Sequence, residues 1–152
     1  MDKSVADSKV FNPWNPLNKE IPQQVIERIL RAYGWRGKML NGDIFKQACV
    51  HKSYVSRPDV WAEQAAQTEE EVIMMPRPEN CMALRESDNE ELEFAGDSIL
   101  GTIISLYVYE RYPGEGEGFM TKLKTRIVNN KTLGEMAKKM GLGQWMIISR
   151  LT

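Results

Sequence analysis

The sequence predicts an all-α fold built around one long, central, buried helix, and three observations support this prediction. A mostly apolar run extends from Asp88 to Tyr112, where the following Pro113-Gly114 supplies a stop signal. Its length of about 24 residues corresponds to roughly 36 Å of helix. Apolar side chains cover the run nearly all round, which is typical of a helix inside a domain. Shorter segments on both sides repeat their apolar residues with helical spacing.

The first elements of the chain lead up to this helix. Residues 1–20 show no apolar period and are expected to form an extended or disordered lead-in. Residues 21–33 place apolar side chains on one side and are predicted to form a helix that ends at Gly34. A second helix is predicted over residues 43–55.

The segment 57–86 interrupts the helical pattern with three prolines and an acidic triplet. Its composition leaves open a disordered loop, a partner-binding arm and a short extra helix. Helical spacing returns after the long helix, over residues 119–129 and again over residues 132–140, where Gly141 ends the last predicted helix.

Length and composition are those of a folded protein with one domain, which we expect to occupy residues 21–152. The chain has 152 residues, 42% of them hydrophobic, and no apolar stretch long enough to cross a membrane. Because no secretory leader is recognisable, we expect an intracellular protein. The cytoplasm is the expected compartment, with an organelle or the nucleus as alternatives. Cys49 and Cys81 then read as reduced thiols.

Three carboxylates stand out at the start of the long helix. Ser87 and Glu90 have the spacing of a capping box, so the helix is expected to begin near Asp88. Glu90, Glu93 and Asp97 then share one stripe of its surface. The helix dipole accounts for acids in the first turn but not for Asp97, more than two turns in. Residue chemistry alone leaves a divalent-cation site, a buried ion pair and a solvated stripe as interpretations.

The single histidine, His51, invites a catalytic interpretation that we do not favour. Its neighbours define an inward side of the second predicted helix, and we therefore expect a packed or hydrogen-bonded structural histidine.

Three segments in order resemble the ribonuclease III domain. Residues 89–98 read NEELEFAGDS, which is similar to the hallmark N-E-x-L-E-F-[large apolar]-G-D-S of that family, with Ala95 as the departure. Residues 47–54, QACVHKSY, resemble the family's Q-A-[FL]-T-H-[RKS]-S-Y segment. Residues 117–124, EGFMTKLK, and 128–133, VNNKTL, resemble its E-G-x-[ML]-[ST]-[RK]-x-[RK] and [LV]-V-x-N-x-[TS]-L stretches.

The resemblance implies a ribonuclease III-type endonuclease domain that hydrolyses double-stranded RNA with a divalent metal, leaving 5′-phosphate and 3′-hydroxyl ends. By position, Glu93 and Asp97 would be catalytic and would bind Mg²⁺, with Mn²⁺ as an alternative ion. Glu90 and Glu117 match supporting acidic positions. Family members pair through the hallmark helix, so the resemblance implies a homodimer with Phe94 at its interface.

Contacts with RNA would need a local basic patch, because the net charge of the chain is −1. Four basic residues follow the hallmark helix closely, with two more further on, and an ordinary solvated helix face is the alternative interpretation. The RNA-contact candidates are Lys122, Lys124, Arg126 and Lys131, followed by Lys138 and Lys139.

Besides Ala95, this chain departs from the family pattern in two places. The family's second carboxylate pair, in a D-x-x-E-A segment, lies further from Asp97 than this chain extends, and no D-x-x-E follows Asp97. We therefore expect a nuclease domain cut short before its last helices, which leaves open whether this chain is active or an inactive fragment, and we expect apolar surface on the long helix to be exposed. Segment 57–86 is longer than the matching family connection and looks like an insertion.

Three functions are thus carried forward. The chain is expected to be part of an active ribonuclease III enzyme. The first alternative is a non-catalytic ribonuclease III-like subunit that binds RNA or dimerises. The second is a helical interaction module unrelated to RNA.

Overall fold

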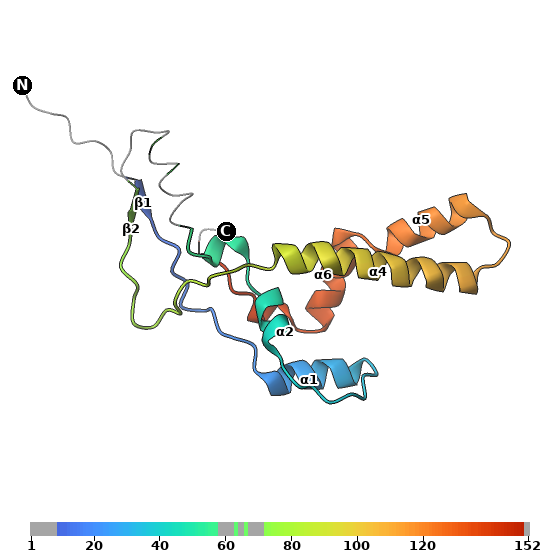
Figure 1. Ribbon diagram of the computed structural model, residues 1–152, viewed down its shortest axis with the longest axis horizontal. Coiled ribbons are helices and arrows are strands. Elements are labelled where there is room, and N and C mark those ends of the chain that lie inside the picture. Colours follow the sequence, from blue (N-terminus) through green and yellow to red (C-terminus); the bar gives the residue numbers. More distant parts are fainter. Residues whose placement is uncertain (1–8, 58–62, 64–65, 67–71, 151–152) are drawn as a thin grey trace, which may run out of the picture.

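The computed structural model describes residues 9–57, 63, 66 and 72–150, which form mainly helices (Figure 1). The α-helices in this part of the chain are α1 (Gln23–Ala32), α2 (Asp43–Ala48), α4 (Glu90–Arg111), α5 (Glu117–Ile127) and α6 (Asn130–Lys139). Two 3₁₀ turns, η1 (Lys52–Tyr54) and η2 (Gly143–Trp145), and two short strands, β1 (Lys9–Phe11) and β2 (Val72–Met74), complete the elements. The predicted all-α class and the long helix are confirmed.

The main core joins segments that are far apart in the sequence. Tyr54 is fully buried, and its hydroxyl donates a hydrogen bond to the Met82 carbonyl oxygen at 2.8 Å. The Trp14 ring meets the Tyr54 ring edge-on, with 6.4 Å between centroids. A second cluster lies under α1 and includes Ile26 and Cys49. The main cluster consists of Trp14, Val50, Tyr54, Val55, Cys81 and Ile147.

The described part of the lead-in, residues 9–20, is extended and packed. β1 pairs in parallel with β2, which comes from the segment 57–86. The indole N–H of Trp14 donates to the Met75 carbonyl oxygen at 2.7 Å. Thus residues 72–86 supply a strand and core contacts. Residues 1–8, and residues 58–71 apart from 63 and 66, lie outside the described residues.

α1 agrees closely with its prediction, whereas the second predicted helix breaks. α1 ends before Gly34, whose φ of 96° is the left-handed conformation that favours glycine. α2 stops at Ala48, so the prediction of one helix over residues 43–55 is wrong. The cause is a bridge to the end of the chain: the His51 amide donates to the Ile147 carbonyl, and the Ile147 amide to the Cys49 carbonyl, both at 2.9 Å. These partners replace the helical ones.

α4 leaves the rest of the molecule as an arm, with α5 folded back along its outer part (Figure 1). Of the described side chains of α4, Val108 alone is buried. The predicted burial of this helix is therefore wrong for this structure, because α5 is the main element packed along it. Large exposed side chains on α4 are Phe94, Ile99, Ile103, Leu106, Tyr107 and Tyr109. No helix in the described ranges has the length and apolar character needed to cross a membrane.

The predicted capping box at the start of α4 does not form. Asn89 is the N-cap, and the Glu90 amide donates a hydrogen bond to Asp88 Oδ1 at 3.0 Å. Ser87 lies outside the helix, and the backbone and side-chain amides of Asn89 are hydrogen-bonded to Val50 and Ala48.

Candidate functional site

The start of α4 is bound to the segment 47–54 by backbone and amide hydrogen bonds. The Asn89 amide donates to the Val50 carbonyl oxygen at 3.0 Å, and its side-chain amide donates to the Ala48 carbonyl oxygen at 3.2 Å. The Gln47 side chain donates to the Asp88 carbonyl oxygen at 3.1 Å. Two motifs that the sequence separates by about 40 residues thus form one unit, which we call the joint: residues 47–57 with residues 88–90.

Two basic side chains of the joint pair with two of the five acids at the start of α4. Lys52 Nζ lies 3.0 Å from Glu90 Oε1. Arg57 donates to the Asp88 carboxylate and lies 4.0 Å from Glu90 Oε2. Since these groups are partly exposed, each pair contributes on the order of 0–1 kcal/mol to stability. Asp88 and Glu90 therefore already have cationic partners within the chain.

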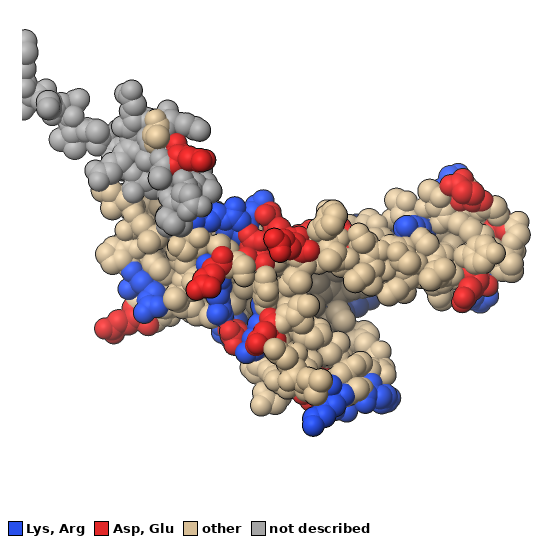
Figure 2. Space-filling view, viewed as in Figure 1, with Lys and Arg blue, Asp and Glu red and all other residues tan. Residues whose placement is uncertain are grey.

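The carboxylates of Glu91, Glu93 and Asp97, unlike those of Asp88 and Glu90, make no hydrogen bond or ion pair with any residue that the structure describes. Glu91 points to another side of the helix from Glu93 and Asp97. Glu93 and Asp97 lie one turn apart on α4, so their side chains share a face with roughly 6 Å between Cβ atoms. Acidic side chains gather at this end of α4 in Figure 2, next to basic ones. The buried ion pair considered for Asp97 is therefore wrong, whereas the cation site and the solvated stripe both fit.

The ligand chemistry of this pair suits a hard divalent cation. Mg²⁺ in proteins is commonly held through one or two carboxylates, with water and substrate phosphates in its other positions. Within the described ranges, no three His, Cys, Asp or Glu side chains are grouped closely enough to hold a metal ion. Glu93 and Asp97 would supply two carboxylate ligands of the kind that Mg²⁺ prefers, and water or substrate phosphates would have to fill its other coordination positions.

Glu117, the other predicted supporting acid, lies away from this pair. It begins α5, beyond the outer end of α4, and its Oε1 accepts a hydrogen bond from the Thr121 hydroxyl at 2.7 Å. From Asp97 to Arg111 the helix rises by about 20 Å. Within one chain, then, the structure joins Glu90, Glu93 and Asp97 on one helix and does not bring Glu117 to them.

The predicted basic patch is divided between two surroundings. Lys122 and Arg126 are exposed and one turn apart on α5, and Lys131 is exposed on α6. Lys124 is half-buried because it leans on α4, where a Cβ added at Gly101 would lie 3.6 Å from its Nζ. Phe94, the predicted interface residue, is 79% exposed on the arm.

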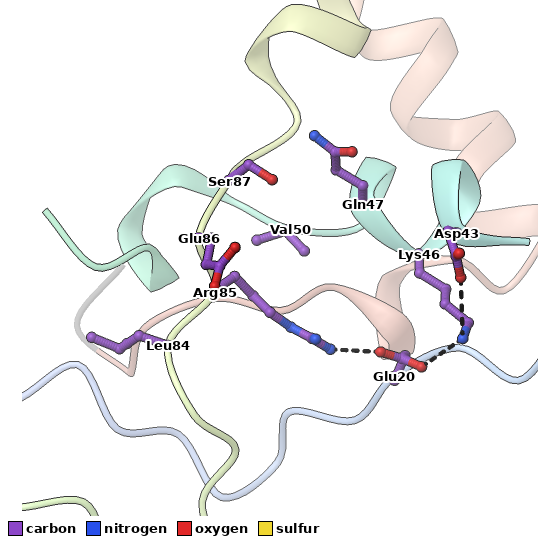
Figure 3. Close-up of a pocket in the computed structure, with 9 residues that line it drawn as sticks. All are labelled: Glu20, Asp43, Lys46, Gln47, Val50, Leu84, Arg85, Glu86 and Ser87. Atoms are coloured by element: carbon purple, nitrogen blue, oxygen red, sulfur yellow. Dashed lines mark hydrogen bonds and ion pairs between the residues drawn. The ribbon is translucent and has the colours of Figure 1, made fainter.

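A polar cavity of about 410 Å³ lies behind the joint, between the lead-in, α2 and residues 84–87 (Figure 3). Glu20 crosses it, 2.9 Å from Lys46 Nζ and 2.7 Å from the Arg85 guanidinium. Hydrogen bonds from Lys46 and then Arg85 lower the pKa of Glu20. Local sequence patterns do not predict this cluster, because Glu20, Lys46 and Arg85 lie in three separate segments of the chain.

His51 occupies the structural role predicted for it. Its Nδ1 lies 2.8 Å from the Ser53 hydroxyl and accepts from the Ser53 amide at 3.2 Å, which caps η1. Cys49 and Cys81 are buried free thiols, and burial raises the pKa of Cys49.

Sequence comparison identifies the relatives of this chain. Residues 90–151 match the model of the ribonuclease III domain. A probable ribonuclease 3 of Acanthamoeba polyphaga mimivirus is 26% identical over 96% of this chain and 26% of its own length. The ribonuclease 3 of Methylococcus capsulatus is 39% identical over 40% of this chain and 26% of its own. That of Chlorobium luteolum is 32% identical over 75% of this chain and 33% of its own.

Structure comparison gives the same fold. The nuclease domain of ribonuclease III from Campylobacter jejuni, described for structural flexibility in the region involved in its dimer formation, superposes with a TM-score of 0.56. The match covers 83% of this chain and 66% of that one, at 20% identity. The chain spans about a quarter to a third of the length of the ribonuclease 3 relatives named above. Its domain match, its relatives and its fold agree, and the chain belongs to the ribonuclease III family.

Proposed function

We propose that this chain is the part of a divalent-metal-dependent endoribonuclease that supplies Glu93 and Asp97 to the cleavage of double-stranded RNA, with 5′-phosphate and 3′-hydroxyl products. The proposal is supported by membership in the ribonuclease III family and by the joint, which unites two of the three motifs that resemble that family.

One observation carries the proposal: the acids at the start of α4 divide into a paired and an unpaired group, and within the unpaired group Glu93 and Asp97 share a face of the helix while Glu91 points to another side. Asp88 and Glu90 are engaged by Arg57 and Lys52, whereas Glu93 and Asp97 face solvent with no partner in the described part of the chain. Two unpaired carboxylates one turn apart repel each other. A bound cation would relieve that repulsion, whereas a purely structural role would not require two unpaired carboxylates so close together.

The role of each residue follows from its place. Glu93 and Asp97 would hold Mg²⁺, which when bound supplies charge neutralisation at the phosphoryl oxygens and activation of water. Lys52 and Arg57 keep the joint closed, so that the first turns of α4 hold a fixed orientation toward RNA. Lys122, Arg126 and Lys131 offer exposed cations for backbone phosphates on the side of α5 and α6.

We further propose that the exposed apolar face of α4, including Phe94, pairs with a second copy of the chain. A cluster of six large exposed apolar or aromatic side chains on one helix is unusual for a surface that meets only water. A two-fold pairing of this face would bring two Glu93–Asp97 sites into one assembly, as cleavage of both strands of a duplex requires.

Cleavage of long duplex RNA by this chain with Mg²⁺ tests the catalytic proposal. We expect Mg²⁺-dependent products that Glu93→Gln and Asp97→Asn each abolish. Glu110→Gln is the matched control, because Glu110 is an exposed acid on the outer end of the same helix. Equal activity in Asp97→Asn and in the unaltered chain would overturn the assignment.

The alternative function, a non-catalytic subunit that binds RNA or dimerises, is favoured by one observation: no group of three metal-binding side chains is present among the described residues. Binding of duplex RNA by the unaltered chain, with no Mg²⁺-dependent product and no effect of Asp97→Asn, would establish this alternative.

A further inference from the structure

A second basic surface lies where α1 faces α6, apart from the acids of α4. The two helices and η2 line a cavity of about 440 Å³, whose walls include Arg28, Tyr33, Lys139, Gln144 and Trp145. Arg28 belongs to α1 and Lys139 ends α6, so residues far apart in the sequence meet at one opening.

Positive charge is concentrated on this surface, although the chain as a whole has no excess of basic residues. The net charge of the chain is −1, yet Figure 2 shows Lys and Arg gathered around α1 and the loop after it, with few acids beside them. We call the exposed cations of this region the α1–α6 basic surface: Arg28, Arg31, Arg36, Lys38, Lys138 and Lys139.

Most of these cations are not neutralised within the chain. Arg31 lies 4.0 Å from the Glu27 carboxylate. No carboxylate of the described residues lies within ion-pair distance of Arg28, Lys138 or Lys139. Like charges held near one another are unfavourable unless an anion joins them, and a polyanion gains the most because it releases its own counterions.

The side chains around the cations suit the backbone of RNA. An arginine guanidinium matches phosphate with two parallel hydrogen bonds. Tyr33 is 62% exposed and carries a hydroxyl, and the Gln144 amide is oriented by its hydrogen bond to the Gly141 carbonyl oxygen at 3.2 Å. Groups of this kind can bond the ribose 2′-hydroxyl, which is both donor and acceptor and distinguishes RNA from DNA.

We propose that the α1–α6 basic surface binds the phosphate backbone of double-stranded RNA, as a docking site separate from the acids of α4 and from Lys122 and Arg126. The proposal rests on the proposed function for the identity of the polyanion. It adds a second contact region on the substrate, so that a long duplex reaches the Glu93–Asp97 face already held at another place.

Binding of a labelled RNA duplex, measured by fluorescence anisotropy over a salt series in EDTA, tests this proposal without cleavage. The variant is Arg28→Gln with Lys139→Gln. The matched control is Arg77→Gln with Arg111→Gln, which removes the same charge at exposed positions elsewhere. We expect the variant to bind about tenfold more weakly near 0.1 M salt and its salt slope to fall by about 2, since each phosphate contact contributes about 0.9. The control should stay within about twofold of the unaltered chain.

Each other outcome has a defined meaning. Equal affinity of variant and control would overturn the docking site and leave the cleavage proposal standing. Absence of duplex binding by the unaltered chain would overturn both the docking site and the RNA partner of the proposed function. Binding to phosphatidylserine-containing vesicles without binding of RNA would assign the surface to membranes and overturn the proposal. Far-UV circular dichroism of both double variants confirms that they are folded.

Discussion

The inner and outer parts of α4 belong to one continuous helix but meet different surroundings. The inner part starts in the joint, where hydrogen bonds and ion pairs connect it to residues 47–57. The outer part projects as an arm with α5 along it and large apolar side chains facing solvent. An apolar run in the sequence thus predicts a helix, but the burial of each part of that helix depends on which distant segments pack against it.

The largest expected effect on stability is in the main core cluster, at Tyr54. Tyr54→Ala removes a fully buried ring and its hydrogen bond to Met82, which should lower the free energy of unfolding by about 3–5 kcal/mol. Urea unfolding followed by circular dichroism measures it. Tyr109→Ala on the arm is the matched control and should cost less than about 0.5 kcal/mol, because that ring is 67% exposed. Similar losses in the two variants would contradict the contrast between core and arm.

A smaller effect is expected at the joint. Asn89→Ala removes the side-chain hydrogen bond to the Ala48 carbonyl and keeps the backbone bond to Val50, so we expect a loss of about 1 kcal/mol. Amide hydrogen exchange should show faster opening of the first turn of α4, with the outer turns unchanged. Asn130→Ala, an exposed asparagine at the start of α6, serves as the control. Uniform acceleration along α4 would mean that the joint does not hold the inner part separately.

Acidification should weaken the cluster around Glu20. Hydrogen bonds from Lys46 and Arg85 hold the pKa of Glu20 below its ordinary value near 4.5, so the stabilisation is present above that value and is lost as the pH falls through the lowered pKa. The partners are partly exposed, which limits the effect to less than about 1 kcal/mol. Glu20→Gln should flatten the acid limb of the stability curve measured by urea unfolding, whereas Glu110→Gln should leave it unchanged. Identical acid limbs for Glu20→Gln and the unaltered chain would argue against this linkage.

The smallest effect on monomer stability is expected on the arm itself. Phe94→Ser should change the unfolding free energy by less than about 0.5 kcal/mol, because the ring is 79% exposed. The same change should reduce self-association measured by sedimentation velocity, if the apolar face of α4 is the pairing surface. Leu40→Ser is a matched control, since Leu40 is 89% exposed and far from α4 in the sequence. Unchanged association in Phe94→Ser would place the pairing surface elsewhere.

Local sequence patterns predicted the positions of most helices. They did not predict the helix caps or which helix surfaces are buried. The apolar spacing and Gly34 located α1, and the run ending at Tyr112 located α4. The break of the helix after Ala48 was not predictable, because it depends on Ile147, almost 100 residues away. Ser87 and Glu90 predicted a capping box that does not form, because Asn89 is the N-cap and Asp88 accepts from the Glu90 amide.

The candidate site shows the same limit. The spacing of Glu93 and Asp97 placed them on one face, and the structure adds that Lys52 and Arg57 engage their neighbours. The basic residues on α5 and α6 were visible in the sequence as a run, whereas the fold was needed to show that Arg28 of α1 and Lys139 of α6 line one cavity. The metal, the pairing of two copies and the RNA partner stay predictions until they are measured.

The hydrogen bonds that close the lead-in have a consequence for the order of folding. Asn18 and Ile148 exchange two of them: the Asn18 side chain donates to the Ile148 carbonyl oxygen at 3.0 Å and accepts from the Ile148 amide at 3.1 Å. Contacts between such distant residues carry a large loop-closure entropy and form late. During synthesis, Trp14 therefore leaves the ribosome long before Ile147 and Ile148 can cover it. In a newly made chain the Trp14 cluster therefore lacks one of its members until Ile147 has been synthesised.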